Sequence, residues 1–368
     1  MKKDSKTVSR KLNFGAGPAM LPEEVLMQVS EAVRDYAGTG MSILELPHRG
    51  KYFRDILDEA ASLVRSLCAI DSSYHVLWIP GGRLQFAMIP QNFMLPDVPA
   101  GYIDSGHWSA QAISYAQLYG MTEVLASSQE KQYHQLPIWP DTHHKNLSYL
   151  HFTTNNTVEG TQWKEDPQTS VPLIADMSSD IFSCTRDFSR YSFFYAVAQK
   201  NIGAAGITLA VVHDDLLKRT IQKLPPILSY QAYVQHKSVV NTPPVFAIYT
   251  ALLMLRWTSR QTLKQIDLQN EEKAKMLYAE IERNTLFYTQ VEDEASRSRM
   301  NICFRGINPQ VEHNFPTFCA AYDITGISGH RSVGGFRVSL YNAIPIQAVK
   351  TLIEAMKDFE TEFLNKKS

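Results

Sequence analysis

Two apolar runs joined by a short polar stretch constrain the fold of this chain more than any other feature. Residues 193–198 are apolar and aromatic, and Gln199, Lys200 and Asn201 follow before a second apolar run at residues 207–212. Runs of this length bounded by glycine are typical of buried strands. The pattern predicts two buried strands with Lys200 at the turn between them. Turn lysines are usually solvated; the alternative is a desolvated lysine with a lowered pKa that acts as a Schiff-base nucleophile.

The composition excludes several classes of protein. A chain of 368 residues with ordinary hydrophobic and charged fractions is globular, and at about 150 residues per domain it suggests two domains. The net charge of -1 gives no footprint for nucleic acid or an anionic membrane. The longest apolar segment, residues 242–255, is shorter than the ~20 residues of a membrane span. Residues 1–11 lack the apolar stretch of a secretory signal and are expected to be a frayed tail.

Short predicted strands alternate with predicted helices through the first two thirds of the chain. This alternation indicates an α/β layer with a mostly parallel sheet. The expected strands, besides the two above, are residues 75–79, 102–104, 122–125, 149–152 and 171–175. The polar segment 259–270 is the expected domain boundary. Beyond it we expect an α+β region with a helix at 269–283, strands at 301–305, 317–322 and 336–340, and a final helix at 345–363.

Glycine-rich and basic turns are candidate anion sites. Gly81, Gly82 and Arg83 follow a predicted strand and precede a helix, which is the geometry of a phosphate cradle, although the loop is not a Walker A motif. His48 and Arg49 also precede a helix, where they form either an anion site or an ordinary salt bridge.

Polar residues at predicted strand ends are further candidates. Asp176 closes an apolar run, where it could hold a cation such as a pyridinium nitrogen or cap a turn. Trp108 lies at a strand-to-helix junction, where α/β proteins bind ligands; a core position is the alternative. No metal site is expected at His134, His143, His144 and His151, which lack ligand spacing. The four scattered cysteines are expected to be buried reduced thiols in a cytoplasmic protein.

Taken together, these pieces resemble the phosphoserine aminotransferase family, fold-type I enzymes of class V that use pyridoxal 5′-phosphate. The resemblance covers nearly the whole chain, and the order and number of its short motifs make it specific. The motifs are residues 13–20, 22–26, 48–51, 81–83, 106–108, 176–180, 198–203, 241–244, 297–301, 329–335 and 341–343. The resemblance implies a large domain at 16–260 with a mostly parallel seven-stranded sheet, and a small α+β domain at 261–368. Residues 1–15 would pack with the small domain.

The resemblance also assigns roles to single residues. Lys200 would hold the cofactor as a Schiff base and shuttle the proton, and Asp176 would pair with the pyridinium nitrogen. The remaining cofactor contacts would be Gly82, Arg83, Trp108, Thr157 and Gln199, with Asn241 and Thr242 from a partner subunit. The substrate anions would meet His48, Arg49, His330, Arg331 and Arg337, some of them supplied across a homodimer interface.

The implied reaction is a reversible transamination between L-glutamate and 3-phosphohydroxypyruvate that gives 2-oxoglutarate and O-phospho-L-serine, in serine biosynthesis. Family members also form 4-phosphohydroxy-L-threonine in pyridoxine biosynthesis. Another class-V enzyme, such as an alanine–glyoxylate aminotransferase, would use Lys200 and Asp176 equally well. A nucleotide-binding α/β protein is a third reading, although no loop completes its fingerprint. The chain departs from the family pattern at Pro47, where serine is usual, and in a short polar linker at 258–263.

Overall fold

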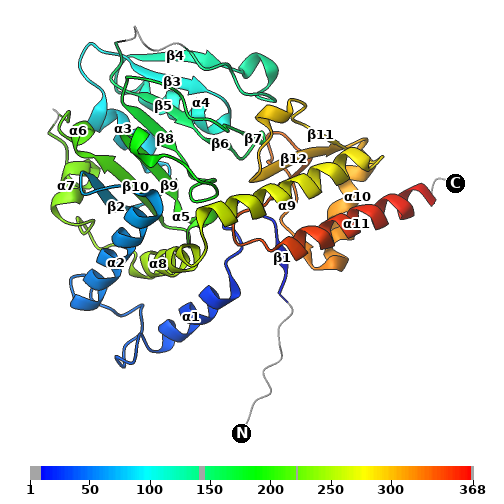
Figure 1. Cartoon of the computed structure of the whole chain (residues 1–368), viewed down its shortest axis with the longest axis horizontal. Helices are drawn as coiled ribbons and strands as arrows, with labels where there is room; N and C mark the ends of the chain where they lie inside the picture. Colours follow the sequence, from blue (N-terminus) through cyan, green and yellow to red (C-terminus); the bar gives the residue numbers. More distant parts are fainter. Residues whose placement is uncertain (1–9, 141–145, 221–222, 366–368) are drawn as a thin grey trace.

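A seven-stranded sheet forms the centre of the larger part of the molecule, as the computed structural model shows for residues 10–140, 146–220 and 223–365 (Figure 1). The strand order is β2-β10-β9-β8-β5-β3-β4. The strands are β2 (Tyr74–Pro80), β3 (Ala100–Asp104), β4 (Thr122–Ser127), β5 (Leu150–Thr153), β8 (Leu173–Asp176), β9 (Phe193–Val197) and β10 (Ile207–His213). β10 alone runs opposite to the other six strands of this sheet. The predicted mostly parallel seven-stranded sheet is therefore confirmed.

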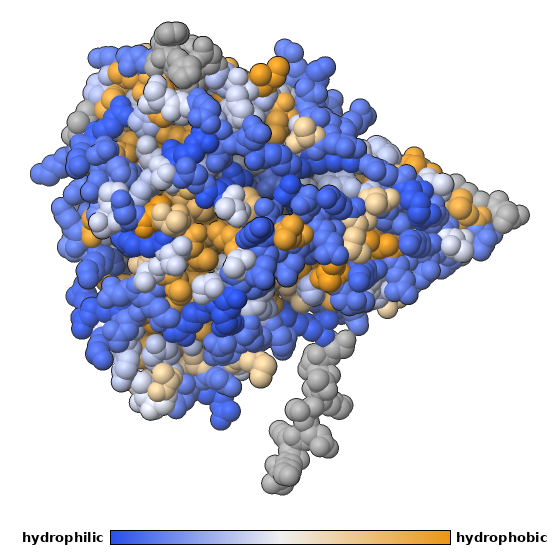
Figure 2. All heavy atoms as spheres, in the orientation of Figure 1, coloured by the Kyte–Doolittle hydropathy of each residue, from blue (hydrophilic) through white to orange (hydrophobic). Residues whose placement is uncertain are grey.

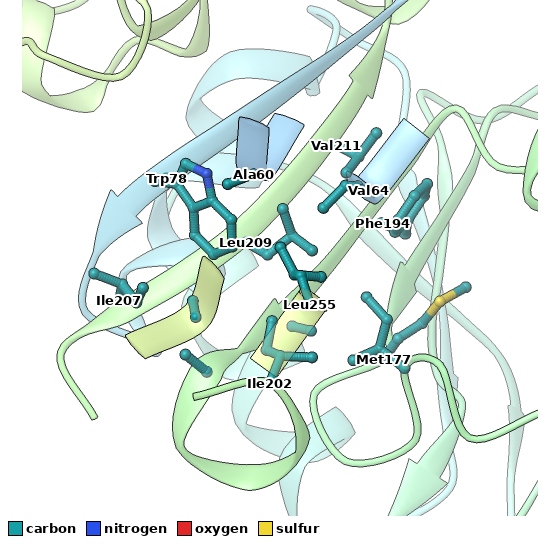
Figure 3. Packing of buried hydrophobic residues seen from close by; sticks show 14 of the residues in the cluster. Ala60, Val64, Trp78, Met177, Phe194, Ile202, Ile207, Leu209, Val211 and Leu255 are labelled. Atoms are coloured by element: carbon teal, nitrogen blue, oxygen red, sulfur yellow. The ribbon is translucent and has the colours of Figure 1, made fainter. Parts of the chain in front are cut away.

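Helices cover both faces of this sheet, which explains why its central strands are apolar throughout. One face packs against α1 (Glu23–Arg34), α2 (Lys51–Cys68) and α8 (Val245–Ser259), and the other against α3 (Leu84–Phe93), α4 (His107–Ala116) and α7 (Tyr230–Gln235). In α2, buried residues recur at helical spacing, and Ala60 and Val64 meet the sheet near Leu209 and Phe194 (Figure 3). This packing on both faces holds the sheet rigidly and so fixes the positions of the strand ends.

The prediction of a simple turn at Lys200 is wrong in detail. Residues Ala198–Asn201 form a short helix, α5, between the antiparallel strands β9 and β10. The chain then turns at Gly203, where an added Cβ would lie 3.1 Å from the Cα of Ala251 in α8. Apolar runs reveal the two strands, but the conformation of the polar residues between them depends on packing against α8.

A second, smaller layer lies at the C-terminal end, around a separate hydrophobic core (Figure 1). Its antiparallel sheet has the order β11-β12-β14. The elements are α9 (Leu263–Arg283), β11 (Phe287–Thr289), β12 (Asn301–Gly306), α10 (Pro309–Cys319), β13 (Ile324–Thr325), β14 (Phe336–Ser339) and α11 (Ile346–Asn365). The N-terminal strand β1 (Leu12–Asn13) pairs with β13, and Phe14 is buried in this core.

One expectation for this region is wrong, and one helix boundary differs. The strand expected at 317–322 is the end of α10 followed by the 3-10 helix η5 (Ala320–Tyr322). Asn308 caps α10 through the N–H of Val311, and Val311, Phe315 and Cys319 are buried at a spacing of four residues. The helix expected at 269–283 starts earlier than expected, because α9 begins at Leu263 with a capping box at Thr262.

Short elements complete the described chain. They are β6 (Asn155–Asn156), β7 (Thr161–Gln162), α6 (Asp214–Leu217), η1 (Gln129–Lys131), η2 (Phe188–Arg190), η3 (Pro226–Leu228) and η4 (Glu294–Ser296). The β6–β7 hairpin contacts both parts of the molecule, since the N–H of Ser298 donates to the carbonyl of Gly160 at 2.8 Å.

The surface is mostly polar. Figure 2 shows hydrophilic residues over most of one face, with apolar residues gathered near its middle. Among the described residues, no helix combines the length and the apolar content that crossing a bilayer requires. The four cysteines are unpaired, as expected; Cys68, Cys303 and Cys319 are buried and Cys184 is half-buried.

Candidate active site

The carboxyl ends of the sheet strands surround a cavity of about 260 Å³. Ligands of open α/β sheets bind at this edge. The cavity is lined by Gly82, Arg83, Phe86, Trp108, Asp176, Ser178, Tyr195, Val197, Gln199 and Lys200. Most of these residues come from the segments directly after β2, β3, β8 and β9, so four separate stretches of sequence meet at one place.

Lys200 is the nucleophile candidate of this cavity. Desolvation lowers the pKa of its amine to about 8, and the charge of Asp176 opposes that shift. The Nζ atom lies 5.7 Å from the centre of the Trp108 ring. Within the described ranges, no hydrogen bond or ion pair engages this amine. A sizeable neutral fraction near neutral pH and a free lone pair are what attack on a carbonyl requires.

Asp176 lies at the end of β8 and is almost fully buried. Its Oδ1 accepts the N–H of Ser178 at 2.9 Å. Burial, followed by the charge of Asp176 and a hydrogen bond to it, raises the pKa of Tyr195 well above its usual value. The ring of His151 contacts the Tyr195 hydroxyl at 3.1 Å, and burial lowers the pKa of His151 to about 3. Tyr195 and His151, on the protein side of the carboxylate, are thus neutral near pH 7. A cation in the cavity would give the carboxylate a partner of opposite charge.

The loop at Gly82 forms an anion cradle at the start of α3. An added Cβ at Gly82 would lie 2.7 Å from Val197 Cγ1, so a side chain here would displace Val197 or the loop. Neither the N–H of Gly82 nor that of Arg83 has a hydrogen-bond acceptor in the described parts of the chain. Free N–H groups at a helix N-terminus favour phosphate. The Arg83 guanidinium adds positive charge and lies 5.1 Å from the centre of the Trp108 ring.

Trp108 forms one wall of the cavity from the first turn of α4. Its Nε1–H donates to Thr157 Oγ1 at 3.0 Å, which fixes the plane of the indole. The Thr157 hydroxyl hydrogen remains available for a ligand oxygen. An amine, a buried carboxylate, an aromatic wall and a phosphate cradle together match the functional groups of pyridoxal 5′-phosphate, so the residues present fit that cofactor.

The predicted substrate residues fall into two groups. Arg337 on β14 lies beside the cavity residues, and its Nη1 donates to the carbonyl of Thr157 at 2.9 Å. The His330 ring is 5.4 Å from that of His107, and desolvation lowers the pKa of both histidines. Arg331 is exposed on the same loop.

Like Thr157 and the three substrate residues above, four other predicted residues do not line the cavity. His48 is half-buried and Arg49 exposed in the loop before α2, and Asn241 and Thr242 are exposed before α8. The single chain therefore brings together most of the expected cofactor set and leaves these four outside it.

Two further features shape the site: Tyr195, which the sequence did not single out, and the Gly/Pro loop within the family motif at residues 13–20. Tyr195 lies within an apolar run, where nothing marks its hydroxyl as a partner of Asp176. Gly17 has a φ of 142°, and a Cβ there would lie 3.5 Å from side-chain atoms of both Gln199 and Lys200. The N–H of Ala19 donates to the carbonyl of Gln199 at 2.8 Å. The Gly/Pro loop of the N-terminal segment is thus a close support of the lysine.

The histidines considered for metal binding are dispersed. His134 contacts Gln290 and His151 contacts Tyr195, while His143 and His144 lie outside the described residues. Across residues 10–140, 146–220 and 223–365, no group of three potential ligands is arranged to hold a metal ion.

Comparison with known proteins supports the geometric reading of the cavity. Residues 11–352 match the family model described as aminotransferase class-V. A phosphoserine aminotransferase from Flavobacterium psychrophilum is 42% identical over 362 residues, which is 96% of this chain and 99% of the relative. One from Bacillus cereus is 41% identical with the same coverage of both chains.

Solved structures agree with these matches. The phosphoserine aminotransferase from Bacillus circulans subsp. alkalophilus has a TM-score of 0.91 and 40% identity, covering 96% of this chain and 99% of that one. A structure described as radiation damage of the Schiff base in phosphoserine aminotransferase has a TM-score of 0.93 and 36% identity, covering 96% and 100%. An alanine–glyoxylate aminotransferase from Nostoc, at 16% identity, a TM-score of 0.71 and 97% coverage of both chains, shares the fold alone.

Proposed function

Since this chain belongs to the phosphoserine aminotransferase family of the class-V aminotransferases, we propose that it transfers the amino group of L-glutamate to 3-phosphohydroxypyruvate. The products are 2-oxoglutarate and O-phospho-L-serine, and the reaction is reversible. Conversion of the four-carbon phosphorylated keto acid to 4-phosphohydroxy-L-threonine is a proposed second activity. The observation that carries the proposal is the desolvated amine of Lys200. It has no hydrogen bond or ion pair within the described chain, and it shares one cavity with Asp176, Trp108 and the cradle at Gly82.

Each cavity residue has a task in this chemistry. Bound pyridoxal 5′-phosphate supplies an electron sink that makes the substrate Cα–H acidic. Lys200 would hold the cofactor through its Nζ, and the same amine would take the proton from the substrate Cα. Asp176 keeps the ring nitrogen protonated, because a buried carboxylate stabilises a neighbouring cation. The N–H groups of Gly82 and Arg83, with Gln199, hold the phosphate, and Trp108 and Thr157 orient the ring.

Arginines and histidines suit substrates that each carry two anionic groups. We propose that Arg337 binds the α-carboxylate, since its guanidinium offers a planar fork of donors. His330 and Arg331 would bind the second anion, together with His48 and Arg49. Mixed histidine and arginine side chains suit a pocket that must accept both a phosphate and a carboxylate.

We also propose a homodimer with composite active sites. His48, Arg49, Asn241 and Thr242 are assigned to the site but lie away from the cavity of their own chain. The exposed side chains of Leu44 and Tyr52, 63% and 42% exposed, lie in the same region and would suit an apolar contact. Asn241 and Thr242 of one subunit would then reach the cofactor phosphate of the other.

Two coarser assignments complete the proposal. We divide the chain into a large domain at 16–260 and a small domain at 261–368. Residues 10–15 belong to the small domain, which the pairing of β1 with β13 supports, and the rest of the predicted segment 1–15 lies outside the described residues. A cytoplasmic location is proposed for the enzyme, supported by its unpaired cysteines.

The test is a coupled assay of the purified protein with O-phospho-L-serine and 2-oxoglutarate, alongside its visible absorption spectrum. We expect an imine chromophore and glutamate formation, both lost in Lys200→Ala. A colourless protein that stays inactive with added pyridoxal phosphate would contradict the assignment. Equal rates with unphosphorylated serine or alanine, unaffected by Arg49→Gln or Arg331→Gln, would instead indicate another class-V activity.

A further inference from the structure

Glu159 occupies an unusual position beside the candidate active site. It belongs to the β6–β7 hairpin and is only 4% exposed. Its Oε1 accepts the backbone N–H of His107 at 2.7 Å, at the start of α4. Two residues earlier on the same hairpin, Thr157 binds both Trp108 through its hydroxyl and Arg337 through its carbonyl. Glu159 therefore lies on the segment that links the aromatic wall of the cavity to the proposed carboxylate clamp.

The second oxygen of this carboxyl has no partner. Glu159 Oε2 is buried and makes no hydrogen bond in the described structure. The residue lies on the wall of a second cavity, of about 610 Å³, between the two parts of the molecule. Burying a carboxylate oxygen without a donor is costly, and buried charges are normally paired. This arrangement calls for a functional reason.

The missing counterpart is Arg337. Its Nε is also buried without a partner, and no carboxylate forms a salt bridge with it in the described ranges. The charge of Arg337 does act on Glu159 and favours its ionised form. The buried carboxyl of Glu159 and the half-buried guanidinium of Arg337 thus influence each other without a hydrogen bond or ion pair between them in the described ranges. An anionic substrate group bound at Arg337 would attract the guanidinium and repel the ionised Glu159.

We propose that Glu159 is a positioning residue that couples the binding of a carboxylate at Arg337 to proton uptake by its own carboxyl. When Glu159 is ionised, it offsets the charge of Arg337 in the free enzyme. When a substrate carboxylate arrives, it takes over that role, and the ionised Glu159 becomes a like charge in the same buried region. Protonation removes the repulsion, and the neutral carboxyl still accepts the His107 N–H. The inference depends on the proposed role of Arg337.

The electrostatic surroundings of Glu159 give this coupling its pH range. Desolvation raises the pKa of Glu159 to about 7, helped by the charge of Asp104 and opposed by the N–H of His107 and by Arg337. Tyr133 and Cys303 face the same carboxyl from other elements. Further titratable groups on the wall of the second cavity are His107, His134, Glu292 and Arg305. A group half-ionised near neutral pH takes up roughly half a proton when a neighbouring anion arrives.

The experiment measures the binding of succinate, a dicarboxylate that cannot react, to the holoenzyme by calorimetry from pH 5.5 to 8.5. Buffers of different ionisation enthalpy report the number of protons taken up. For the natural protein we expect uptake to peak near pH 7 and the Kd to rise roughly fivefold between pH 6 and 8. In Glu159→Gln both effects should largely disappear. Glu292→Gln, on the same cavity wall but exposed, is the matched control and should behave like the natural protein.

The histidines near the site provide the alternative explanation. Desolvation lowers the pKa of His107 and His330, so these groups would take up protons below pH 6.5. An identical pH dependence in the natural protein and in Glu159→Gln would overturn the inference, as would failure to bind succinate. If Glu159→Gln does not fold, the pH dependence of proton uptake by the natural protein still tests the inference. A peak of uptake near pH 7 supports Glu159 as the group, and a peak below pH 6 contradicts it.

A second measurement separates charge from structure. Because its pKa is raised, the Glu159 carboxyl stabilises the fold most when protonated, and this contribution is lost as the pH rises from its unfolded value through about 7. Glu159→Gln should raise the midpoint of thermal unfolding by about 2–5 °C at pH 8 and leave it unchanged at pH 5. Intact succinate coupling without phosphoserine turnover would refute only the proposed substrate; turnover without coupling would refute only the role of Glu159.

Discussion

Two lysines whose pKa is lowered by desolvation, Lys200 and Lys273, show how the same shift can serve opposite purposes. Desolvation lowers the pKa of Lys200 to about 8 and that of Lys273 to about 7. The difference is in their partners. Lys273 on α9 donates to the carbonyls of Leu340, Tyr341 and Ile344, each at 3.1 Å, whereas Lys200 has no acceptor in the described residues.

The comparison separates structure from reactivity. Three carbonyl oxygens accept hydrogen bonds from all three donors of the Lys273 ammonium. The Lys273 side chain therefore stabilises the turn after β14 and has no donor left for a ligand. Lys200 is left free beside a cavity and a carboxylate. The two regions are also connected, since the N–H of Asn342 donates to Asn201 Oδ1 at 3.0 Å, one residue after Lys200. A lowered lysine pKa alone therefore does not identify a nucleophile; the unused donors do.

Replacing the free lysine should have the largest effect. We expect Lys200→Ala to reduce kcat by about 10³-fold or more, because both covalent attachment and proton transfer are lost. Single-turnover conversion of O-phospho-L-serine measures this. The urea midpoint should change little, since no hydrogen bond to the amine is removed. If the variant kept a tenth of the natural activity, the distinction between the two lysines would fail.

Replacing the committed lysine should mainly affect stability. Lys273→Met leaves three buried carbonyl groups without their donor, so we expect a loss of about 3 kcal/mol in the free energy of unfolding. Chemical denaturation measures it, with Lys200→Met as the matched control that loses no hydrogen bond. The kcat of the folded fraction should stay within about twofold of the natural value. An unchanged stability would show that the three contacts contribute nothing.

The pH dependence of cofactor capture should distinguish the free amine from an ordinary one. Only neutral Lys200 attacks a carbonyl, so the rate at which the apoprotein takes up pyridoxal phosphate should rise about tenfold per pH unit below 8 and then level off. Stopped-flow absorbance follows the reaction. A rate that continued to rise towards pH 10 would mean that burial has not altered this lysine.

The smallest expected effect tests the space around the free lysine. In Gly82→Ala the new Cβ would lie 2.7 Å from Val197 Cγ1, just before α5, so the cradle must shift. We expect the affinity for pyridoxal phosphate to fall about tenfold, because two phosphate-binding N–H groups would be displaced. Titration of the apoprotein measures this. Gly81→Ala is a useful comparison, since nothing lies within 4 Å of its Cβ but its φ of 76° is strained for alanine.

The sequence predicted most residues of the cavity but few of the residues that hold them in place. Lys200, Asp176 and Gly82 each adjoin an apolar run, so strand periodicity places them at one sheet edge, and the family resemblance adds their chemistry. Lys273 shows no such signal, because in an amphipathic helix a charged residue normally marks the solvent side. Its burial depends on residues 340–344, nearly seventy positions away.

The same limit applies to Tyr195 and Glu159. A tyrosine within an apolar strand and a glutamate in a polar loop look ordinary until tertiary packing places Asp176 or His107 beside them. The wrong strand at 317–322 has a simpler origin: its aromatic and apolar residues suit a strand locally, and the helical spacing of Val311, Phe315 and Cys319 was the stronger signal.

The N-terminal strand has a mechanical consequence for the whole molecule. β1 is fastened to β13, the hydroxyl of Tyr341 donates to the carbonyl of Ala16, and Ala19 is fastened to Gln199 next to the reactive lysine. The segment from Asn13 to Ala19 is therefore a linker anchored to both parts of the enzyme. Fully extended, its six peptide steps reach about 20 Å. This length limits how far the small part could move away from the large sheet. Such a movement would first displace Gly17, which lies against the Lys200 side chain.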